Sequence, residues 1–405
     1  LGAFAVSLFL LRFVPQQFFP SSDRPELTMD MTLPQSASIH ATQANVERME
    51  ALLKDDPDID HYSAYVGRGA IRFILTLNVQ LANPFFAQFV IVAKDVEARE
   101  RLHAKLEKLL AGQFPDVVGY VSPLELGPPV GWPLQYRVSG PDPDEVRRIA
   151  LELADVVGTE PRSRHVNFDW MEPARQLRVN VNQDQARQLG ISSAALAGTL
   201  NAAVTGTTVT QIRDDIYLIN VVARATDAER ASFESLSSLQ VATPGGRMVP
   251  LRQFATFSEE QEFPLVWRRD RVPTLTVRAD VTPGVLADTV VGDLAPRIKE
   301  FAAQLPRPYK VVTGGLYEES AVSRGSVFAV LPLMIGLMLI IMMVQLVSFR
   351  RLAMVVGIMP LGLIGVVLAL LLFNRPLGFV AILGVLALIG MIAKNAVILI
   401  VQIET

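Results

Sequence analysis

The chain has 405 residues, of which 50% are hydrophobic and 19% are charged, and its mean hydropathy is +0.33. This mixture predicts membrane-spanning helices joined to a sizeable water-soluble part. The net charge of −3 gives no indication of nucleic acid as a partner. The absence of cysteine excludes disulfide frameworks and thiolate metal sites.

An apolar run at residues 1–11 opens the chain. It is too short to span a bilayer. It also lacks the basic n-region and the small-residue cleavage site of a secretory signal peptide. We therefore expect residues 1–14 to be the end of a truncated transmembrane helix.

Residues 25–125 show the order strand, helix, strand, strand, helix, strand. Asp95 is the expected N-cap of the second helix, because apolar residues then recur at helical spacing as far as Gly112. The expected strands are 26–33, 59–66, 71–79 and 116–121, with a further extended run at 89–93. The expected helices are 38–54 and 95–112.

The same order begins again at residue 132, with strands predicted near 134–139, 164–170, 274–281 and 309–313. An insertion at 173–262 divides this second unit into 132–172 and 263–316, and it has α+β patterning of its own. Two split βαβ units follow from this repeat, so we expect two ferredoxin-like βαββαβ subdomains, the second interrupted by a small α+β subdomain.

Three apolar stretches at 326–347, 352–373 and 377–403 complete the chain, and each is long enough to cross a bilayer as a helix. The loop between the first two carries Arg350 and Arg351, whereas the next carries Arg375 alone. The positive-inside rule therefore places Arg350 and Arg351 in the cytoplasm.

Lys394 is the one charged residue between 377 and 403. At about 1.5 Å per residue it lies roughly 13 Å from the end of that helix, farther than its side chain reaches. A charge at this depth costs at least ~2.5 kcal/mol, so Lys394 needs a partner. That partnership serves either transport or only helix packing. Asn395 either joins the same network or hydrogen-bonds a neighbouring helix.

Three segments are distinctive: the run GMIAKNAVILI at 390–400, residues 179–206 with NQDQA and LGIS, and GGRMVPL at 245–251. Together they resemble the C-terminal half of resistance-nodulation-division (RND) efflux transporters of the hydrophobe and amphiphile multidrug branch. The first segment is similar to the tenth membrane helix of that family, and the other two resemble its docking subdomain. The order of elements agrees over essentially the whole chain.

This resemblance implies a proton antiporter, not an enzyme, in the bacterial inner membrane, with the soluble block in the periplasm. It implies two porter subdomains, the docking subdomain at 173–262, and a homotrimer. Amphiphilic small molecules would pass through a periplasmic adaptor (membrane fusion) protein to an outer-membrane channel, without a cofactor. It also implies that Lys394 and Asn395 belong to a proton relay with acidic residues of another helix.

Gly67-Arg68-Gly69 is similar to the family's switch loop, which implies substrate contact by Tyr65, Arg68 and Phe73. Glycines allow the backbone to change shape, and an aromatic ring with an arginine suits mixed apolar and charged ligands. The alternatives are a plain hairpin for Tyr65 and Arg68 and ordinary core packing for Phe73. The loop has fewer phenylalanines than the family's drug exporters, which weakens the case for drug-like substrates.

Other chemistries find little support. The four histidines are scattered, and the chain has no phosphate-binding loop and no nucleophile elbow. The methionines of the membrane segments suit apolar filling better than a copper relay. Two rival functions remain: a protein-secretion accessory of the same superfamily, and a membrane-anchored periplasmic binding or scaffold module without transport.

Overall fold

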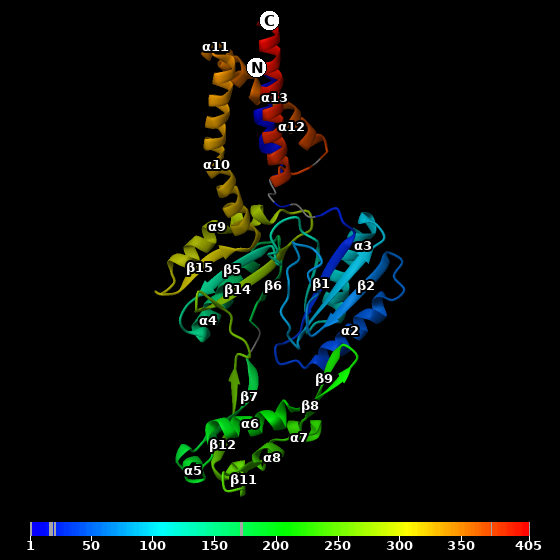
Figure 1. The fold of residues 1–405 in the computed structure, drawn as a ribbon, viewed down its shortest axis with the longest axis vertical. Helices are drawn as coiled ribbons and strands as arrows, with labels where there is room; N and C mark the ends of the chain where they lie inside the picture. Colours follow the sequence, from blue (N-terminus) through cyan, green and yellow to red (C-terminus); the bar gives the residue numbers. More distant parts are fainter. Residues whose placement is uncertain (1, 16–18, 20–21, 171–172, 374, 405) are drawn as a thin grey trace. The chain divides into compact units, whose positions relative to one another are not determined.

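The computed structural model describes residues 2–15, 19, 22–170, 173–373 and 375–404. It divides into two compact units, Leu1–Glu172 with Leu265–Thr405, and Pro173–Pro264. Figure 1 shows the elements of both.

The first sheet has the antiparallel strand order β2-β3-β1-β4. Its strands are β1 (Glu26–Thr32), β2 (Ile59–Val66), β3 (Phe86–Ala93) and β4 (Val118–Pro123). Helices α2 (Ile39–Leu53) and α3 (Val96–Gln113) follow β1 and β3. The Asp95 carboxylate accepts a hydrogen bond from the Ala98 N–H, which confirms the predicted cap.

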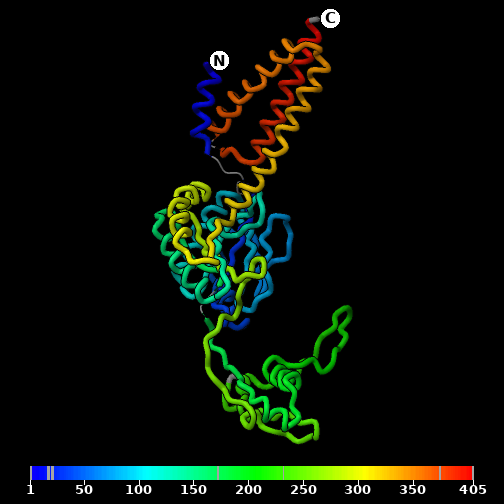
Figure 2. The backbone as a smooth tube through the Cα atoms, turned by 90° about the vertical axis from the view of Figure 1, so that its left-hand side faces the viewer, coloured from blue at the N-terminus to red at the C-terminus, as the bar shows by residue number. Residues whose placement is uncertain are grey.

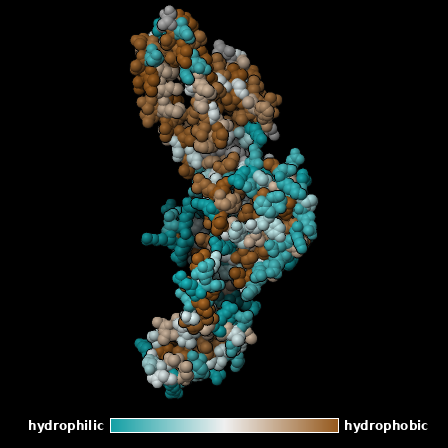
Figure 3. Space-filling view, turned by 45° about the vertical axis from the view of Figure 1, so that its right-hand side comes forward, coloured by the Kyte–Doolittle hydropathy of each residue, from teal (hydrophilic) through white to brown (hydrophobic). Residues whose placement is uncertain are grey.

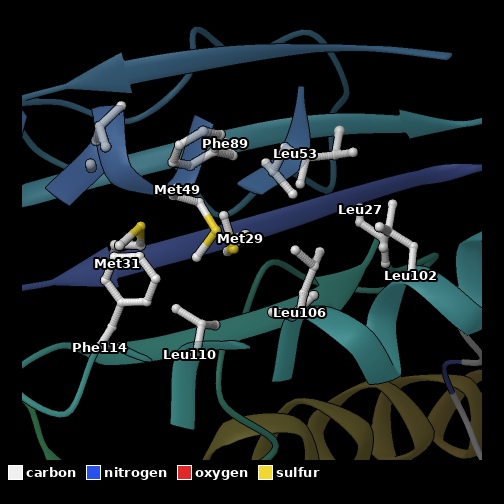
Figure 4. Close-up of a cluster of buried hydrophobic side chains, with 14 of the residues drawn as sticks. Leu27, Met29, Met31, Met49, Leu53, Phe89, Leu102, Leu106, Leu110 and Phe114 are labelled. Atoms are coloured by element: carbon white, nitrogen blue, oxygen red, sulfur yellow. The ribbon is translucent and has the colours of Figure 1, made fainter. Parts of the chain in front are cut away.

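The core of this unit lies between the sheet and its two helices (Figure 4). Leu27, Met29 and Met31 alternate along β1 and are all buried, so one face of this strand is fully apolar. They pack with Met49 of α2 and Leu106 of α3. Asp30 therefore lies on the opposite face of the sheet.

The strand predicted at 71–79 is wrong, because residues 67–85 form an irregular segment without a strand. The alternating Ile71 and Leu75 suggested a strand, yet their side chains are 65% and 80% exposed. The strand beside β2 is instead Phe86–Ala93. Almost all of its residues are buried, so its pairing in the sheet removes more apolar surface from water than pairing of residues 71–79 would.

The second sheet repeats the order of the first, as β6-β14-β5-β15. Its strands are β5 (Leu134–Ser139), β6 (Ser163–Phe168), β14 (Val272–Val281) and β15 (Lys310–Gly314), with the short β13 (Arg268–Arg269) at the start of β14. Helices α4 (Pro143–Gly158) and α9 (Ala287–Ala303) occupy the positions equivalent to α2 and α3.

The inserted unit has a small core that includes Ile191, Leu196 and Phe254. Its strand pairs are β7 (Ala174–Val181) with β12 (Ala255–Glu262), β10 (Gln240–Ala242) with β11 (Met248–Pro250), and β8 (Thr207–Asp214) with β9 (Tyr217–Ala223). Its helices are α5 (Gln183–Gln188), α6 (Ser193–Val204), α7 (Asp227–Ala231), α8 (Phe233–Ser237) and the 3₁₀ turn η2 (Leu251–Gln253).

Among the described residues, three helical stretches are long and apolar enough to cross a membrane: Gly315–Leu346, Phe349–Leu372 and Phe379–Ile403. They correspond to α10 (Gly315–Leu346), to α11 (Phe349–Ile358), η3 (Met359–Leu361) and α12 (Gly362–Leu372), and to α13 (Phe379–Glu404). The short α1 (Gly2–Leu10) and η1 (Leu11–Phe13) precede the soluble part, and α1 contacts α12 (Figure 2).

Helix α10 begins at Gly315, well before the predicted start at 326, because no proline or turn separates β15 from the apolar segment. Met342 and Leu346 of α10 pack with Val355 of α11 and Ala393 of α13. Figure 3 shows hydrophobic residues covering the outside of these helices.

Leu106→Ala should lower the stability of the intact protein by about 2–5 kcal/mol, because it leaves a cavity in the core beneath the first sheet. The measurement is the apparent melting temperature in detergent. Leu151→Ala, on the exposed side of α4, is the matched control and should leave the melting temperature almost unchanged. Equal shifts for both variants would contradict the position of this core.

Candidate functional site

Lys394 lies on the side of α13 that the described helices leave open. The preceding Ala393 is buried against α10 and α11, whereas Lys394 and Asn395 are exposed. Helix α12 approaches α13 closely elsewhere, since a Cβ on Gly362 would lie 2.7 Å from Ile392 Cδ1. The open face of α13 also carries the exposed Met391 and Ile398.

No residue in the described part of the chain forms a hydrogen bond or salt bridge with the side chain of Lys394 or Asn395. The ammonium thus lies on an apolar helix face, and no carboxylate of the described residues is within salt-bridge distance of it. An unpaired cation in the hydrocarbon region of a bilayer is energetically costly.

The structure places Tyr65, Arg68 and Phe73 at one edge of the first sheet. Tyr65 lies near the end of β2 and packs beside a small buried cluster of Ala70, Leu77 and Leu124. Arg68 is exposed and Phe73 is 45% exposed, both on the irregular segment 67–85. None of the three lines the cavity described next.

A cavity of about 340 Å³ lies between the polar faces of the two sheets. Asp30 of β1 and Tyr120 of β4 line it on one side, and Phe168 of β6 and Arg278 of β14 line it on the other. Segment 67–85 contributes Asn78, Gln80, Asn83 and Phe85. The remaining aromatic residues of the wall are Phe86, Trp132 and Trp267.

Arg278 is the cation in the wall of this cavity, and its side chain is half-buried. Its Nε donates to Asn167 Oδ1 at 3.0 Å, and its Nη2 donates to the Phe168 carbonyl at 2.6 Å. The guanidinium also lies 5.6 Å from the ring centroid of Trp132, within the range of a cation–π contact. Burial lowers the pKa of Arg278, while Asp169 and Asp30 act in the opposite direction.

Two half-buried carboxyl groups, those of Asp30 and Asp169, accompany this arginine. Burial raises the pKa of Asp30 to about 6, and the hydrogen bond from Gln88 and the charge of Arg278 oppose that rise. Burial also raises the pKa of Asp169, whose carboxylate accepts the Thr276 N–H at 2.8 Å. The cavity therefore combines aromatic walls with charges of both signs, which suits a ligand that has an apolar body and a charged group.

Sequence reasoning missed this cavity and its charged residues. Asp30 and Arg278 each lie on the polar face of a strand whose residues alternate between apolar and polar, which is the signal that could have indicated them. A single charge on such a face is normally solvated. Only the tertiary structure brings these two strands together across a cavity, although they lie far apart in the sequence.

The described residues contain no group of three or more histidine, aspartate and glutamate side chains able to hold a metal ion. Met29 and Met31 are in the core beneath the first sheet, on the face of β1 opposite Asp30. Met338 and Met342 pack in the helix cluster. These positions suit methionine as an apolar filler.

Comparison with solved structures shows the same fold in two crystal forms of a heavy metal efflux pump. The first matches with a TM-score of 0.79 and 20% sequence identity over 98% of this chain and 41% of the pump. The second matches with a TM-score of 0.77 and 21% identity over 100% of this chain and 42% of the pump. The chain thus spans about two fifths of the length of these structures.

The family comparison covers the whole chain, because the model of the AcrB/AcrD/AcrF family matches residues 1–405. Its element order, its three apolar helices and its charged helix α13 all fall within that match. The chain belongs to the AcrB/AcrD/AcrF family of RND efflux transporters.

Proposed function

We propose that this chain is the C-terminal half of a proton-motive-force-driven RND exporter that works as a homotrimer in the bacterial inner membrane. The observation that carries the proposal is the open face of α13, on which Lys394 has no partner among the described residues. A membrane anchor gains nothing from such a cation, whereas a charge that exchanges partners can drive a conformational change.

In this proposal Lys394 pairs with acidic residues of another membrane segment, and Asn395 hydrogen-bonds within the same network. Protonation of those carboxylates removes their attraction for the ammonium. The helix face then adopts a different packing, which couples proton entry to movement of the soluble part.

The two sheet units have the strand order of a ferredoxin-like fold, and we assign them as porter subdomains in the periplasm. The inserted unit is assigned as the docking subdomain, which leads captured compounds toward an outer-membrane channel with the help of a periplasmic adaptor protein. A complete second porter unit with a docking insertion favours this assignment over a protein-secretion accessory.

The cavity between the sheets is the proposed substrate site. Its aromatic residues suit an apolar body, and Asp30 and Arg278 suit a charged group, so amphiphilic compounds are the favoured substrate class. We assign Tyr65, Arg68 and Phe73 to the approach to this cavity, where they would contact compounds before or after binding.

A metal cation is the second candidate substrate, because the two solved structures compared above are described as crystal forms of a heavy metal efflux pump. The chemistry of the cavity favours amphiphiles, since β1 directs Met29 and Met31 into the core. Cells that express the intact protein separate the two substrates: amphiphilic dyes should be exported, and tolerance of copper, silver and zinc should stay unchanged. Increased metal tolerance without dye export would overturn the assignment.

Lys394→Met in the intact protein should reduce energised efflux at least about tenfold, equivalent to ~1.4 kcal/mol of lost coupling. The substitution keeps the length and apolar character of the helix but removes the positive charge. Lys394→Arg should also be severely impaired, because a planar guanidinium cannot replace a compact ammonium in repeated pairing. The measurement is dye efflux at matched protein level and matched crosslinked trimer.

Lys310→Met is the matched control, because it removes an exposed lysine from β15 in the soluble part. Its efflux should remain near that of the wild type. Near-wild-type efflux by Lys394→Met would reduce the lysine to a packing detail and remove the basis of the proposal.

Tyr65→Ala and Arg68→Ala should change which amphiphiles are exported, by about threefold to tenfold between compounds, and leave trimer assembly intact. A ligand-contacting residue sets relative affinities, whereas a core residue sets stability. The measurement is a panel of dye and detergent susceptibilities, with Arg187→Ala on the inserted unit as the control. Loss of folded protein without a changed profile would show that these residues are structural.

A further inference from the structure

Gln88 of β3 connects the cavity to segment 67–85. Its side chain is almost fully buried, with 2% of its surface exposed. Its Nε2 donates to Asp30 Oδ1 at 2.7 Å, and its Oε1 accepts the Ala70 backbone N–H at 2.7 Å. One amide group therefore joins a carboxylate in the cavity wall to the backbone of the irregular segment.

The charge of Asp30 decides which way this amide faces. An ionised carboxylate can only accept hydrogen bonds, so Gln88 must present its NH₂ group to Asp30. Its carbonyl oxygen then necessarily faces Ala70, whose N–H can only donate. The reverse orientation would place oxygen against oxygen and donor against donor, and both Asp30 and the Ala70 N–H would lose these hydrogen bonds.

Segment 67–85 packs tightly around this amide. The Gly67 N–H donates to the Phe86 carbonyl at 2.8 Å, and the Asn83 N–H donates to the Gly67 carbonyl at 3.0 Å, which closes the two ends of the segment. A Cβ on Gly69 would lie 2.8 Å from Gln80 Cβ and 3.2 Å from Gln88 Oε1. Only glycine fits between these side chains without a shift.

The same segment supplies Asn78, Gln80 and Asn83 to the wall of the 340 Å³ cavity. Beyond its closed ends, the described contacts of this segment with the protein include a small apolar cluster, in which Ala70 and Leu77 are buried beside Leu124. The amide of Gln88 holds Ala70, which belongs to that cluster. A change at Gln88 therefore reaches the cavity wall through Ala70.

We propose that Gln88 is a positioning residue for the substrate cavity. The Asp30 carboxylate, which can only accept hydrogen bonds, sets the orientation of the Gln88 amide. The amide oxygen then holds the Ala70 N–H and so fixes the conformation of segment 67–85. That this cavity binds substrate rests on the proposed function, whereas the positioning role of Gln88 does not. The positioning role predicts that the conformation of segment 67–85 depends on the hydrogen-bond donors and acceptors of Asp30 and Gln88, and not only on the volume of these side chains.

Trypsin measures this conformation directly, because Arg68 and Arg72 are the only lysine or arginine residues in the segment and both are exposed. The experiment uses the intact protein in detergent at pH 8, where Asp30 is ionised because its pKa is about 6. Cleavage at Arg99 of α3, which is 5% exposed and belongs to the same unit, reports general unfolding in the same sample.

The decisive variants exchange the carboxylate and the amide. In Gln88→Glu two carboxylates face each other, so cleavage at Arg68 and Arg72 should rise at least about fivefold. In the double variant Asp30→Asn with Gln88→Glu, the new amide donates to the new carboxylate, which still accepts the Ala70 N–H. Its cleavage rate should return to within about twofold of the wild type.

Gln35→Met is the matched control, because Gln35 is another buried glutamine and forms no described hydrogen bond with segment 67–85. It should leave cleavage at Arg68 and Arg72 unchanged. Unchanged cleavage in Gln88→Glu would overturn the proposal, and so would an increase that the double exchange does not reverse, whether it is local or general. Restored protection in a protein that exports no amphiphile would contradict the proposed function and leave the positioning role standing.

Discussion

An ammonium group on an apolar helix face is the constraint on which the functional interpretation depends. Helix α13 turns Ala393 into the cluster with α10 and α11, and one residue later it turns Lys394 outward. The cost of a lone charge in hydrocarbon means that this face cannot remain uncovered in a membrane. In the function we propose, these helices form one side of an interface whose other side carries negative charge.

The cavity in the soluble part also contains charged side chains partly shielded from bulk water, but there charges of opposite sign lie near one another. The cavity between the two sheets is lined by Asp30, Asp169 and Arg278, so its half-buried charges partly compensate one another. Backbone groups satisfy several of the remaining bonds, as at Phe168 and Thr276. Such a site can accept a charged ligand without first creating an unpaired charge, because it already contains both signs.

Local sequence patterns were sufficient for some features and insufficient for others. The membrane-spanning length of α13 and the Asp95 cap are set by residues that are neighbours in the sequence, so both features could be predicted. The wrong strand at 71–79 could not be recognised from its own residues, because the segment that pairs with β2 lies farther along the chain at Phe86–Ala93. The cavity could not be predicted either, since Asp30 and Arg278 line one cavity only when the two sheets face each other.

Proton coupling at Lys394 is tested most directly in proteoliposomes that hold the intact protein and a trapped pH indicator. Substrate addition should produce a proton flux in proportion to substrate movement, and Lys394→Met should abolish both fluxes together. Substrate movement with an undiminished proton flux in Lys394→Met would contradict the role assigned to this lysine.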